Sequence, residues 1–397
     1  PILDMPSIDE ITKGKTKIDA LRPIPIEELL GREVIEAQSD LMNLAIKNKT
    51  ILITGAGGSI GSELCRQAIQ HMPKKIILLD ISEENLYKIN EELLQINIYK
   101  IKIISILGSS SNFKLVSKTI KDNNVDIIFH AAAYKHVPIV ELNPIEGIEN
   151  NIFSTVAVCE ASVENNIEKL ILISTDKSVR PANIMGASKR VAELVVQAYA
   201  EKESAKFNKD GNYKGTLFSM VRFGNVLGSS GSVVLKFKEQ IKSGGPITLT
   251  DPNIIRYFMT IKEAAQLVIQ SSVLSQGGDI FLLDMGDPVK IYDLAKQMVN
   301  LSGLSIKNKN NIEGDIEIIS TGLRPGEKLY EELLIDAEAE KTDHPLIFKA
   351  KENFIIMDEI KPKLKNLKKN IDERNKDQTL KILNELVKEW VNQNKIN

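Results

Sequence analysis

The residues whose chemistry is most suggestive stand together at positions 175–177. The apolar run "EKLILIST" (168–175) ends at Thr175, and Asp176 and Lys177 follow it directly. A carboxylic acid beside an amine offers a proton donor and a proton acceptor on neighbouring residues. Free Asp and Lys titrate near ~3.9 and ~10.4, so burial would have to raise the first pKa or lower the second. The pattern favours an acid–base site, with a surface ion pair as the alternative.

A second pair of residues follows in the same stretch, "STDKSVRPANIMGASK" (174–189). Met185 and Lys189 are four residues apart, so a helix would present both on one face. Lys189 could hydrogen-bond a ribose, and its charge would lower nearby pKa values. Met185 is a flexible apolar side chain with no proton to exchange. Proton transfer in this stretch must therefore use other groups.

A glycine-rich turn at 54–61 indicates a dinucleotide site. In "TILITGAGGSIGSEL", glycines follow an apolar run at three-residue spacing and open a helical pattern. Small residues allow a tight turn and a close backbone approach to a pyrophosphate, which the helix N-terminus binds. A second run ends in Asp80, which can bond a ribose hydroxyl and would repel a 2′-phosphate. We predict NAD rather than NADP, with a ligand-free glycine turn as the alternative. The predicted cofactor contacts are Thr54, Gly55, Gly57, Gly58, Ser59, Ile60, Gly61, Asp80, Ala131, Ala132, Ala133 and Lys189.

Apolar runs that alternate with helical patterns predict a doubly wound α/β fold around a parallel sheet. The runs lie at 50–55, 74–80, 102–108, 125–133, 168–175, 216–223 and 279–286. Continuous apolar strands separated by helices are typical of a sheet covered on both faces. Such sheets bind ligands at the carboxyl ends of their strands, so residues 175–177 should emerge beside the nicotinamide.

The same pattern suggests four segments. We predict an N-terminal arm at 1–46 and a Rossmann domain for NAD at 47–225, with a late strand near 279–285. A smaller α/β substrate-binding domain is predicted at 226–350, where the pattern becomes irregular. The remainder, 351–397, is predicted to be a helical tail with a solvated face.

The amino-acid composition is typical of a globular protein. Of 397 residues, 43% are hydrophobic and 26% charged, with a net charge of -2, so charge alone suggests neither a nucleic-acid nor a membrane-surface partner. Cys65 and Cys159 are far apart, which favours core packing in a reducing cytoplasm over a disulfide or a metal site. No run reaches the roughly 18 apolar residues of a membrane span. The first residue is proline, so we expect a piece of a longer protein.

Several motifs together resemble one enzyme family. They are "TGAGGSIG", "HAAAYKHVP", "STDK", "MGASK", "VRFGNVLGSSGSVV", "ITLTDPNIIRYFM" and "LRPGEKLYEEL", in this order over roughly residues 50–335. The set resembles the extended short-chain dehydrogenases/reductases that act on nucleotide sugars. More narrowly, it is similar to the bacterial UDP-N-acetylglucosamine 4,6-dehydratases of surface-glycan and protein-glycan biosynthesis. Met185 stands where most of the superfamily has a catalytic tyrosine, as in the configuration-retaining long subfamily.

The resemblance implies a chemistry for the 175–177 stretch. In 4,6-dehydration, NAD takes hydride from sugar C4, a base removes the C5 proton, an acid protonates the departing 6-hydroxyl, and hydride returns to C6. By resemblance, Asp176 is the acid and Lys177 the base. The C4 hydroxyl proton could go directly to Asp176, be relayed by Thr175, or go to Lys189 through a water. We favour Asp176 assisted by Thr175, because the carboxyl group is then protonated for the 6-hydroxyl.

The resemblance also implies contacts to the nucleotide sugar. A guanidinium suits a diphosphate, and two arginines lie in the irregular second domain. Lys135 and His136 would line the sugar pocket, although a lone histidine is often structural. The predicted substrate contacts are Lys135, His136, Asn225, Thr248, Leu249, Arg256 and Arg324.

The predicted function is thus NAD-dependent 4,6-dehydration of UDP-N-acetylglucosamine, with three alternatives. A 4-epimerase or a reductase of the same fold normally uses the tyrosine that Met185 replaces. A catalytically inactive NAD-binding regulatory module is the third, and retention of the Asp–Lys pair and Lys189 argues against it. We further expect a homo-oligomer, a dimer or larger. The full-length protein is expected to be membrane-anchored, with this part on the cytoplasmic face of the inner membrane.

Overall fold

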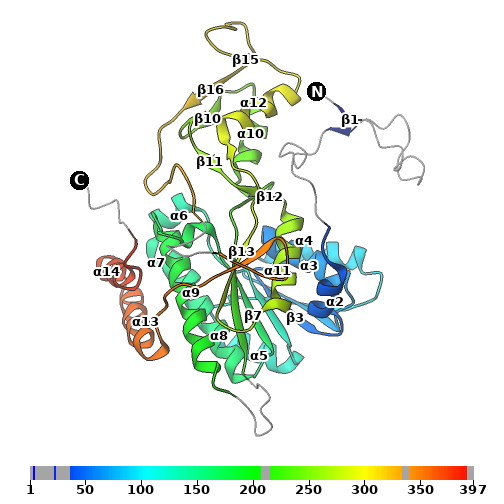
Figure 1. The fold of residues 1–397 in the computed structure, drawn as a ribbon, viewed down its shortest axis with the longest axis vertical. Coiled ribbons are helices and arrows are strands. Elements are labelled where there is room, and N and C mark those ends of the chain that lie inside the picture. Colours follow the sequence, from blue (N-terminus) through cyan, green and yellow to red (C-terminus); the bar gives the residue numbers. More distant parts are fainter. Residues whose placement is uncertain (1–2, 5–21, 24–35, 207–214, 333–338, 391–397) are drawn as a thin grey trace. The chain divides into compact units, whose positions relative to one another are not determined.

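The chain forms two units, which are described separately (Figure 1). The structure is a computed structural model that describes residues 3–4, 22–23, 36–206, 215–332 and 339–390. The larger unit comprises 35–224, 261–284 and 332–397, and the smaller one 1–34, 225–260 and 285–331. Among the described residues, no helix has the length and apolar character needed to cross a membrane.

A nine-stranded sheet forms the centre of the larger unit (Figure 1). Seven strands are parallel and lie in the order β5-β4-β3-β6-β7-β8-β13, and β18 and β17 extend the β13 edge antiparallel. Every predicted apolar run contains one of the parallel strands. Their bounds are β3 Thr50–Thr54, β4 Lys75–Asp80, β5 Lys102–Leu107, β6 Ile127–His130, β7 Lys169–Ile173, β8 Leu217–Arg222 and β13 Asp279–Leu283, and the antiparallel strands are β17 Glu340–Lys341 and β18 Ile347–Ala350.

Helices cover both faces of this sheet, which confirms the predicted doubly wound α/β fold. One layer contains α2 (Ser39–Ile46), α3 (Ser59–Ile69), α4 (Glu83–Ile96) and α11 (Ile261–Leu274). The other contains α5 (Phe113–Asn123), α8 (Ser154–Glu164) and α9 (Ile184–Glu203). The strand order reverses between β3 and β6, and this switch point is where such sheets bind ligands.

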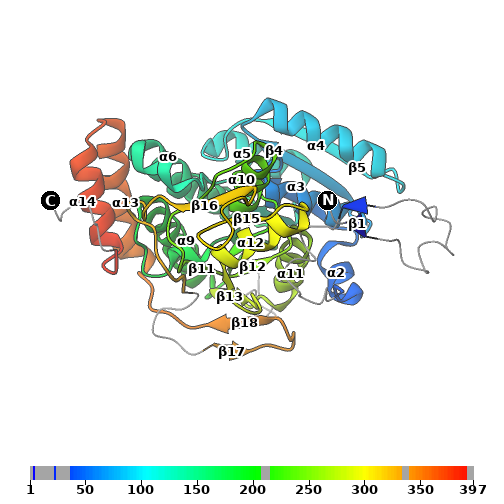
Figure 2. The ribbon, with the colours of Figure 1, turned by 90° about the horizontal axis from the view of Figure 1, so that it is seen from above.

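Helix α9 is buried along most of its length. Every residue from 184 to 200 is buried, because α8 and β8 pack against it together with α13 (Met357–Asp372) and α14 (Lys376–Leu386). The views in Figure 1 and Figure 2 both place α13 and α14 beside α9. Short segments α6 (Val137–Leu142), α7 (Pro144–Ile148) and the π-helix η2 (Glu149–Phe153) connect β6 to α8. A helix surrounded on all sides is expected to be apolar throughout, so charged residues on α9 call for an explanation.

The smaller unit has its own core. Strands β10 (Ile247–Leu249), β16 (Ile316–Ser320) and β15 (Ile306–Lys307) form a parallel sheet. Helices α10 (Val233–Lys242) and α12 (Ile291–Leu301) supply buried apolar side chains such as Phe237 and Leu294. Three two-stranded pairs complete the unit: β9 Asn225–Val226 with β12 Phe258–Met259, β11 Ile255–Arg256 with β14 Val289–Lys290, and β1 Leu3–Asp4 with β2 Arg22–Pro23.

The units differ from the predicted segments at three boundaries. The predicted substrate-binding range 226–350 includes α11 and β18, which belong to the larger unit because their apolar residues complete its helix layer and its sheet. Strand β13, in the same range, corresponds to the late strand that was predicted near 279–285 for the Rossmann domain. The predicted arm 1–46 ends in α2, where Met42 and Ile46 are fully buried against the larger unit. The predicted tail is helical in α13 and α14, which pack on α9. Most of the arm and 391–397 lie outside the described residues.

Both cysteines are buried in the core of the larger unit, as predicted. Cys65 on α3 and Cys159 on α8 are inaccessible to solvent, and neither forms a disulfide. Burial raises the pKa of both thiols, so they remain protonated and pack as small apolar side chains.

Candidate functional site

A short turn after β7 presents the predicted acid–base pair. Thr175 caps the turn η3 (Asp176–Ser178), and its hydroxyl donates to Asp176 Oδ1 at 2.9 Å. The Lys177 ammonium contacts the same oxygen at 2.9 Å. Both of these contacts fall on Oδ1 rather than Oδ2. The structure therefore brings together Thr175, Asp176 and Lys177 as the sequence predicts.

The backbone of this turn continues the ladder between β7 and β8. The Ser174 N–H donates to the Val221 carbonyl at 2.8 Å, and the Asp176 N–H donates to the Phe223 carbonyl at 3.1 Å. Asp176 is buried, whereas 22% of the Lys177 side chain is exposed. In this pair Asp176 is enclosed by protein, whereas Lys177 is partly accessible to solvent.

Helix α9 carries both Met185 and Lys189 in buried positions. Met185 is part of the hydrophobic core, which agrees with its interpretation as an apolar filler. Lys189 donates to the Ile173 carbonyl at 2.7 Å, directly before the acid–base turn. Burial lowers the pKa of Lys189 to about 8, and the negative charge of Glu193 offsets part of that shift. Lys189 can therefore change its charge near neutral pH.

The glycine turn between β3 and α3 has the shape that a pyrophosphate needs. A Cβ at Gly61 would lie 1.9 Å from the Gly55 carbonyl oxygen, so only glycine lets α3 pack against the turn. Gly55 adopts φ +65°, and a Cβ there would lie 2.7 Å from the Ala132 backbone nitrogen. Helix α3 begins at Ser59 after Gly58, and among the described residues no side chain caps it. Backbone N–H groups in the first turn of such a helix, here at Ile60 and Gly61, are suited to binding an anion.

Asp80 lies at the end of β4, next to the glycine turn. Its carboxylate accepts hydrogen bonds from the Gly57 N–H and the Ser82 N–H, each at 2.8 Å. These bonds fix the side chain without using all its lone pairs, since each carboxylate oxygen can accept two. The residues present thus fit a dinucleotide with an unmodified adenosine ribose.

A buried histidine that the sequence analysis did not single out links the glycine turn to the 131–134 loop. His130 Nδ1 lies 2.7 Å from Thr54 Oγ1, and Nε2 lies 3.2 Å from Thr155 Oγ1. The Thr155 hydroxyl donates to the Asn151 carbonyl, so it accepts from Nε2–H, and Nδ1 then accepts from Thr54. Burial, aided by the charge of Lys189, lowers the pKa of His130 to about 3 and keeps it neutral. The Thr54 hydroxyl therefore contributes to the site by holding His130 and accepting from the Ala132 N–H at 3.4 Å.

The loop after β6 is held by another residue that sequence reasoning overlooked. The Asn151 side chain accepts from the Tyr134 N–H at 2.7 Å and donates to the Tyr134 carbonyl and the Ser188 hydroxyl. Lys135 and His136 follow this anchor and are exposed at the start of α6. Ala131, Ala132 and Ala133 precede it and are half-buried.

The two arginines of the smaller unit have different environments. The Arg256 guanidinium donates to the carbonyls of Ile255, Lys328 and Leu329 at 2.7–3.0 Å and is nearly buried. The Arg324 side chain is exposed on a turn that its backbone N–H and carbonyl close with Glu327. Arg256 thus holds the 328–329 backbone, whereas Arg324 projects to solvent.

Three further predicted substrate contacts lie on strands of the same unit. The Thr248 N–H donates to Gln240, which also donates to the Thr248 hydroxyl. The Leu249 carbonyl accepts from the backbone and hydroxyl of Thr321. Asn225 begins β9, and its N–H donates to the Tyr257 carbonyl. Each backbone therefore has contacts within its unit.

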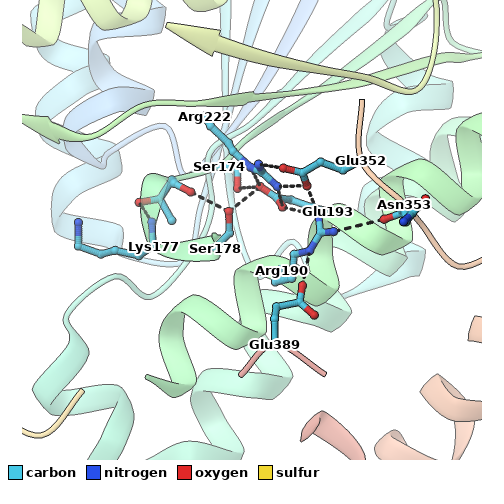
Figure 3. Close-up of polar contacts among 10 residues, drawn as sticks. Ser174, Lys177, Ser178, Arg190, Glu193, Arg222, Glu352, Asn353 and Glu389 are labelled. Carbon is cyan, nitrogen blue, oxygen red and sulfur yellow. Dashed lines mark hydrogen bonds and ion pairs between the residues drawn. The ribbon is translucent and has the colours of Figure 1, made fainter. Parts of the chain in front are cut away.

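A cluster of buried charges lies next to the acid–base turn (Figure 3). It comprises Arg190 and Glu193 on α9, Arg222 at the end of β8, and Glu352 after β18, and it is called the ionic cluster below. The sequence analysis did not predict it. Charged residues within a helix that is buried on every side would have been the signal, but that burial is visible only once α13 and α14 are placed.

Comparison with known proteins places the chain in a family. The sequence profile of the family described as "Polysaccharide biosynthesis protein" matches residues 51–352. The chain belongs to this family. Among its relatives, the capsular polysaccharide biosynthesis protein CapD of Staphylococcus aureus is 44% identical over 384 residues, which are 96% of this chain and 61% of CapD. The probable polysaccharide biosynthesis protein EpsC of Bacillus subtilis is 44% identical over 83% of this chain and 52% of EpsC. The chain thus spans between half and two thirds of the length of these relatives.

Solved structures support the fold of this family member. The X-ray structure of Pen from Bacillus thuringiensis is 31% identical, with a TM-score of 0.66, over 81% of this chain and 98% of Pen. A dTDP-glucose 4,6-dehydratase from Bacillus anthracis, solved with NAD, is 19% identical with a TM-score of 0.55, over 68% of this chain and 84% of that one. The fold is therefore the extended short-chain dehydrogenase/reductase type found among sugar-nucleotide dehydratases and epimerases.

Proposed function

We propose that this chain catalyses NAD-dependent 4,6-dehydration of UDP-N-acetylglucosamine to a 4-keto-6-deoxy sugar nucleotide. The observation that carries the proposal is the turn at Thr175, Asp176 and Lys177, where the proposed base Lys177 and the Thr175 hydroxyl both donate to one carboxylate oxygen of the proposed acid Asp176. Elimination of water requires removal of one proton and delivery of another, and two adjacent groups of opposite role can do both. Neither a simple oxidation nor an epimerisation needs this pair.

NAD is the proposed cofactor, because the glycine turn, α3 and Asp80 fit a dinucleotide with a free ribose hydroxyl. The chemistry that NAD supplies when bound is reversible hydride transfer with the sugar. Lys189 is proposed to bond the cofactor's ribose with its charged form. The NAD complexes of several proteins with the same fold support this assignment.

The proposed steps assign each proton to a side chain. Asp176, assisted by Thr175, accepts the C4 hydroxyl proton and later delivers it to the departing 6-hydroxyl, which leaves as water. Neutral Lys177 removes the C5 proton and returns a proton to C5 at the end. The hydrogen bond from the Thr175 hydroxyl to Asp176 Oδ1 supports this role. Met185 takes no proton and lies in apolar surroundings on α9.

Substrate recognition is proposed to use Arg324 for the diphosphate, since its guanidinium is exposed while that of Arg256 donates to carbonyl groups. Lys135, His136 and Asn225 remain proposed contacts to the nucleotide sugar, and Thr248 and Leu249 remain weaker ones. Self-association and a membrane anchor in a longer protein also remain predictions.

The test is incubation of the purified protein with UDP-N-acetylglucosamine, followed by mass spectrometry of the nucleotide sugar. We expect a product lighter by one water, and no such product from Lys177→Ala even though that variant still binds NAD. If no UDP-hexose loses water, the proposed function is wrong.

The main alternative is 4-epimerisation. The UDP-glucose 4-epimerase of Rickettsia canadensis is 32% identical over 299 residues, which are 75% of this chain and 80% of that protein. An epimerase would change the sugar's configuration without changing its mass. The same incubation therefore separates the two activities, and a module without catalytic activity would leave the substrate unchanged.

A further inference from the structure

The four side chains of the ionic cluster are all buried, as Asp176 is, whereas Lys177 is partly exposed. The side chains of Arg222 and Glu193 are 0% exposed, and those of Arg190 and Glu352 are nearly as buried. Its members come from three parts of the chain that are distant in sequence: α9, the end of β8 and the segment after β18. Figure 3 shows these side chains converging beside Ser174 and Ser178.

The cluster balances its own charge. Arg222 makes two bonds to Glu193, from Nε to Oε1 at 2.8 Å and from Nη2 to Oε2 at 2.6 Å. It makes two more to Glu352, at 2.6 and 2.8 Å. Arg190 Nη1 lies 3.1 Å from a carboxylate oxygen of each glutamate. Two cations and two anions in this geometry satisfy one another, which permits burial.

Glu193 also bonds the polypeptide on both sides of the acid–base pair. Its Oε1 accepts from the Ser174 hydroxyl at 2.5 Å and lies 2.8 Å from the Ser178 hydroxyl. Ser174 and Ser178 flank Thr175, Asp176 and Lys177. A single carboxylate oxygen thus contacts both ends of the segment that carries the proposed acid and base.

Helix α9 holds this segment at a second point. Lys189 lies one turn before Glu193 and donates to the Ile173 carbonyl. The orientation of Glu193 is in turn fixed by Arg222 and Arg190, and theirs by Glu352 and by Glu389, which lies 3.2 Å from Arg190 Nε. Buried ion pairs add little net stability compared with apolar packing, and fixing a geometry is one role that they can serve.

We propose that Glu193 is a positioning residue of the active site: it fixes Asp176 and Lys177 through Ser174 and Ser178, and Glu352 in the C-terminal segment orients it through Arg222 and Arg190. This inference rests on the proposed function. It assigns a catalytic contribution to residues that contact neither substrate nor cofactor. It also implies that Glu352, in the segment after β18, contributes to the geometry of the turn at 175–177.

The decisive variant removes the contacts of Glu193 with Ser174 and Ser178, called the link below, and keeps the charged residues. Ser174→Ala combined with Ser178→Ala deletes both hydroxyls and retains all four charged residues. Ser271→Ala is the matched control, since Ser271 is a fully buried serine on α11 whose hydroxyl donates to the Val268 carbonyl. Ser178→Ala alone serves as a milder second variant in case the double variant does not fold.

We expect the double variant to lose about 10²-fold in kcat, the scale of a small misplacement of reacting groups, with KM within about twofold of the wild type. Its melting temperature should match that of Ser271→Ala. Ser178→Ala should show a smaller loss of kcat in the same direction. If kcat of both variants stays within threefold of the control, or falls only together with the melting temperature, the positioning role is refuted.

Hydrogen exchange separates this inference from the proposed function. The Asp176 N–H donates to Phe223 and the Ser178 N–H to Thr175, so both amides should exchange faster in the double variant than in the control. If the wild-type protein releases no water from any UDP-hexose, the proposed function fails, and the exchange of these amides still tests the link. Unchanged exchange would refute the link whatever the activity.

Discussion

Two ion pairs are connected through Ser174 and Ser178, and they are built in opposite ways. The Asp176–Lys177 pair meets at one carboxylate oxygen, at 2.9 Å, and its lysine is partly exposed. The Glu193–Arg222 pair makes two bonds, is fully buried, and receives further donors from Arg190 and Ser174. A pair that exchanges protons with a substrate needs few competing hydrogen bonds and must be accessible to that substrate. A pair that keeps its charge needs many hydrogen bonds and can be fully buried.

Two charged residues one turn apart on α9, Glu193 and Lys189, also differ in the stability of their charge. Burial raises the pKa of Glu193, but the charges and hydrogen bonds of Arg222 and Arg190 outweigh it and hold that pKa at about 2. Lys189, with a carbonyl rather than a carboxylate as its bonding partner, has a pKa of about 8. Glu193 therefore stays charged at neutral pH, whereas Lys189, one turn earlier on α9, can change its charge.

The largest expected effect comes from breaking the loose pair. Lys177→Ala should reduce kcat by roughly 10³-fold or more, since general-base catalysis contributes about 10²–10⁴-fold. Binding of NAD, measured by calorimetry, should be unchanged. Lys118→Ala, which breaks an exposed ion pair with Asp122 on α5, is the control and should leave kcat unaltered. Full activity in Lys177→Ala would remove this residue from the mechanism.

The tight pair should dominate stability instead. Glu193→Gln leaves Arg222 and Arg190 with less buried negative charge, and the loss of one partner from a buried pair costs about 3–5 kcal/mol. Asp176→Asn should cost about 1 kcal/mol or less, because Lys177 can turn to solvent. Urea unfolding of both variants measures the two free energies. Equal losses would mean that the two pairs do not differ as described.

These two pairs also show how far sequence reasoning reaches. Asp176 and Lys177 were predictable because they directly follow an apolar strand, and the glycine turn and seven strands were predictable for the same local reason. The ionic cluster was not, because Arg222 and Glu352 are 130 positions apart and nothing local pairs them. Strand β18 was overlooked too, since "IFKA" is short and joins the sheet only through its neighbour β13.

Arg256 illustrates a second limit. Its residue type suits a diphosphate, and on sequence alone it carries the same weight as Arg324. The structure shows its guanidinium donating to three backbone carbonyls. A sequence motif cannot reveal these bonds, because two of the carbonyls belong to Lys328 and Leu329, more than 70 positions away.

The adjustable charge of Lys189 predicts a pH profile. If the charged form bonds the cofactor, kcat/KM should fall about tenfold per pH unit above about 8, where Lys189 loses its proton. Lys189→Arg keeps its charge, so this limb should move to higher pH. Persistence of the same limb in Lys189→Arg would assign it to another group.

Stability should respond to Lys189 with the opposite sign. The pKa is about 8 in the folded chain and 10.5 for an unperturbed lysine, so between these values the unfolded chain binds more protons. The contribution of Lys189 to the free energy of unfolding should therefore rise with pH over this window. Urea unfolding at both ends of the window, with the Lys189→Met variant as reference, measures it. A contribution that falls or stays level across the window would contradict the lowered pKa.

The smallest expected effect concerns the Thr175 hydroxyl. Thr175→Val removes one hydrogen bond to Asp176 and should lower kcat by about tenfold, the equivalent of roughly 1.4 kcal/mol. Thr119→Val, a change to another buried threonine on α5, is the control. Unaltered turnover in Thr175→Val would exclude the relay and leave Asp176, or Lys189 through a water, as the acceptor of the C4 proton.

The most direct test of the central claim, that Asp176 and Lys177 carry out an elimination, is the reaction of UDP-N-acetylglucosamine in D₂O. Lys177 exchanges its protons with solvent, so the C5 position it reprotonates should carry deuterium in a product that has lost one water. Lys177→Ala should yield neither change. A product of unchanged composition with no deuterium on carbon would contradict the account and indicate epimerisation.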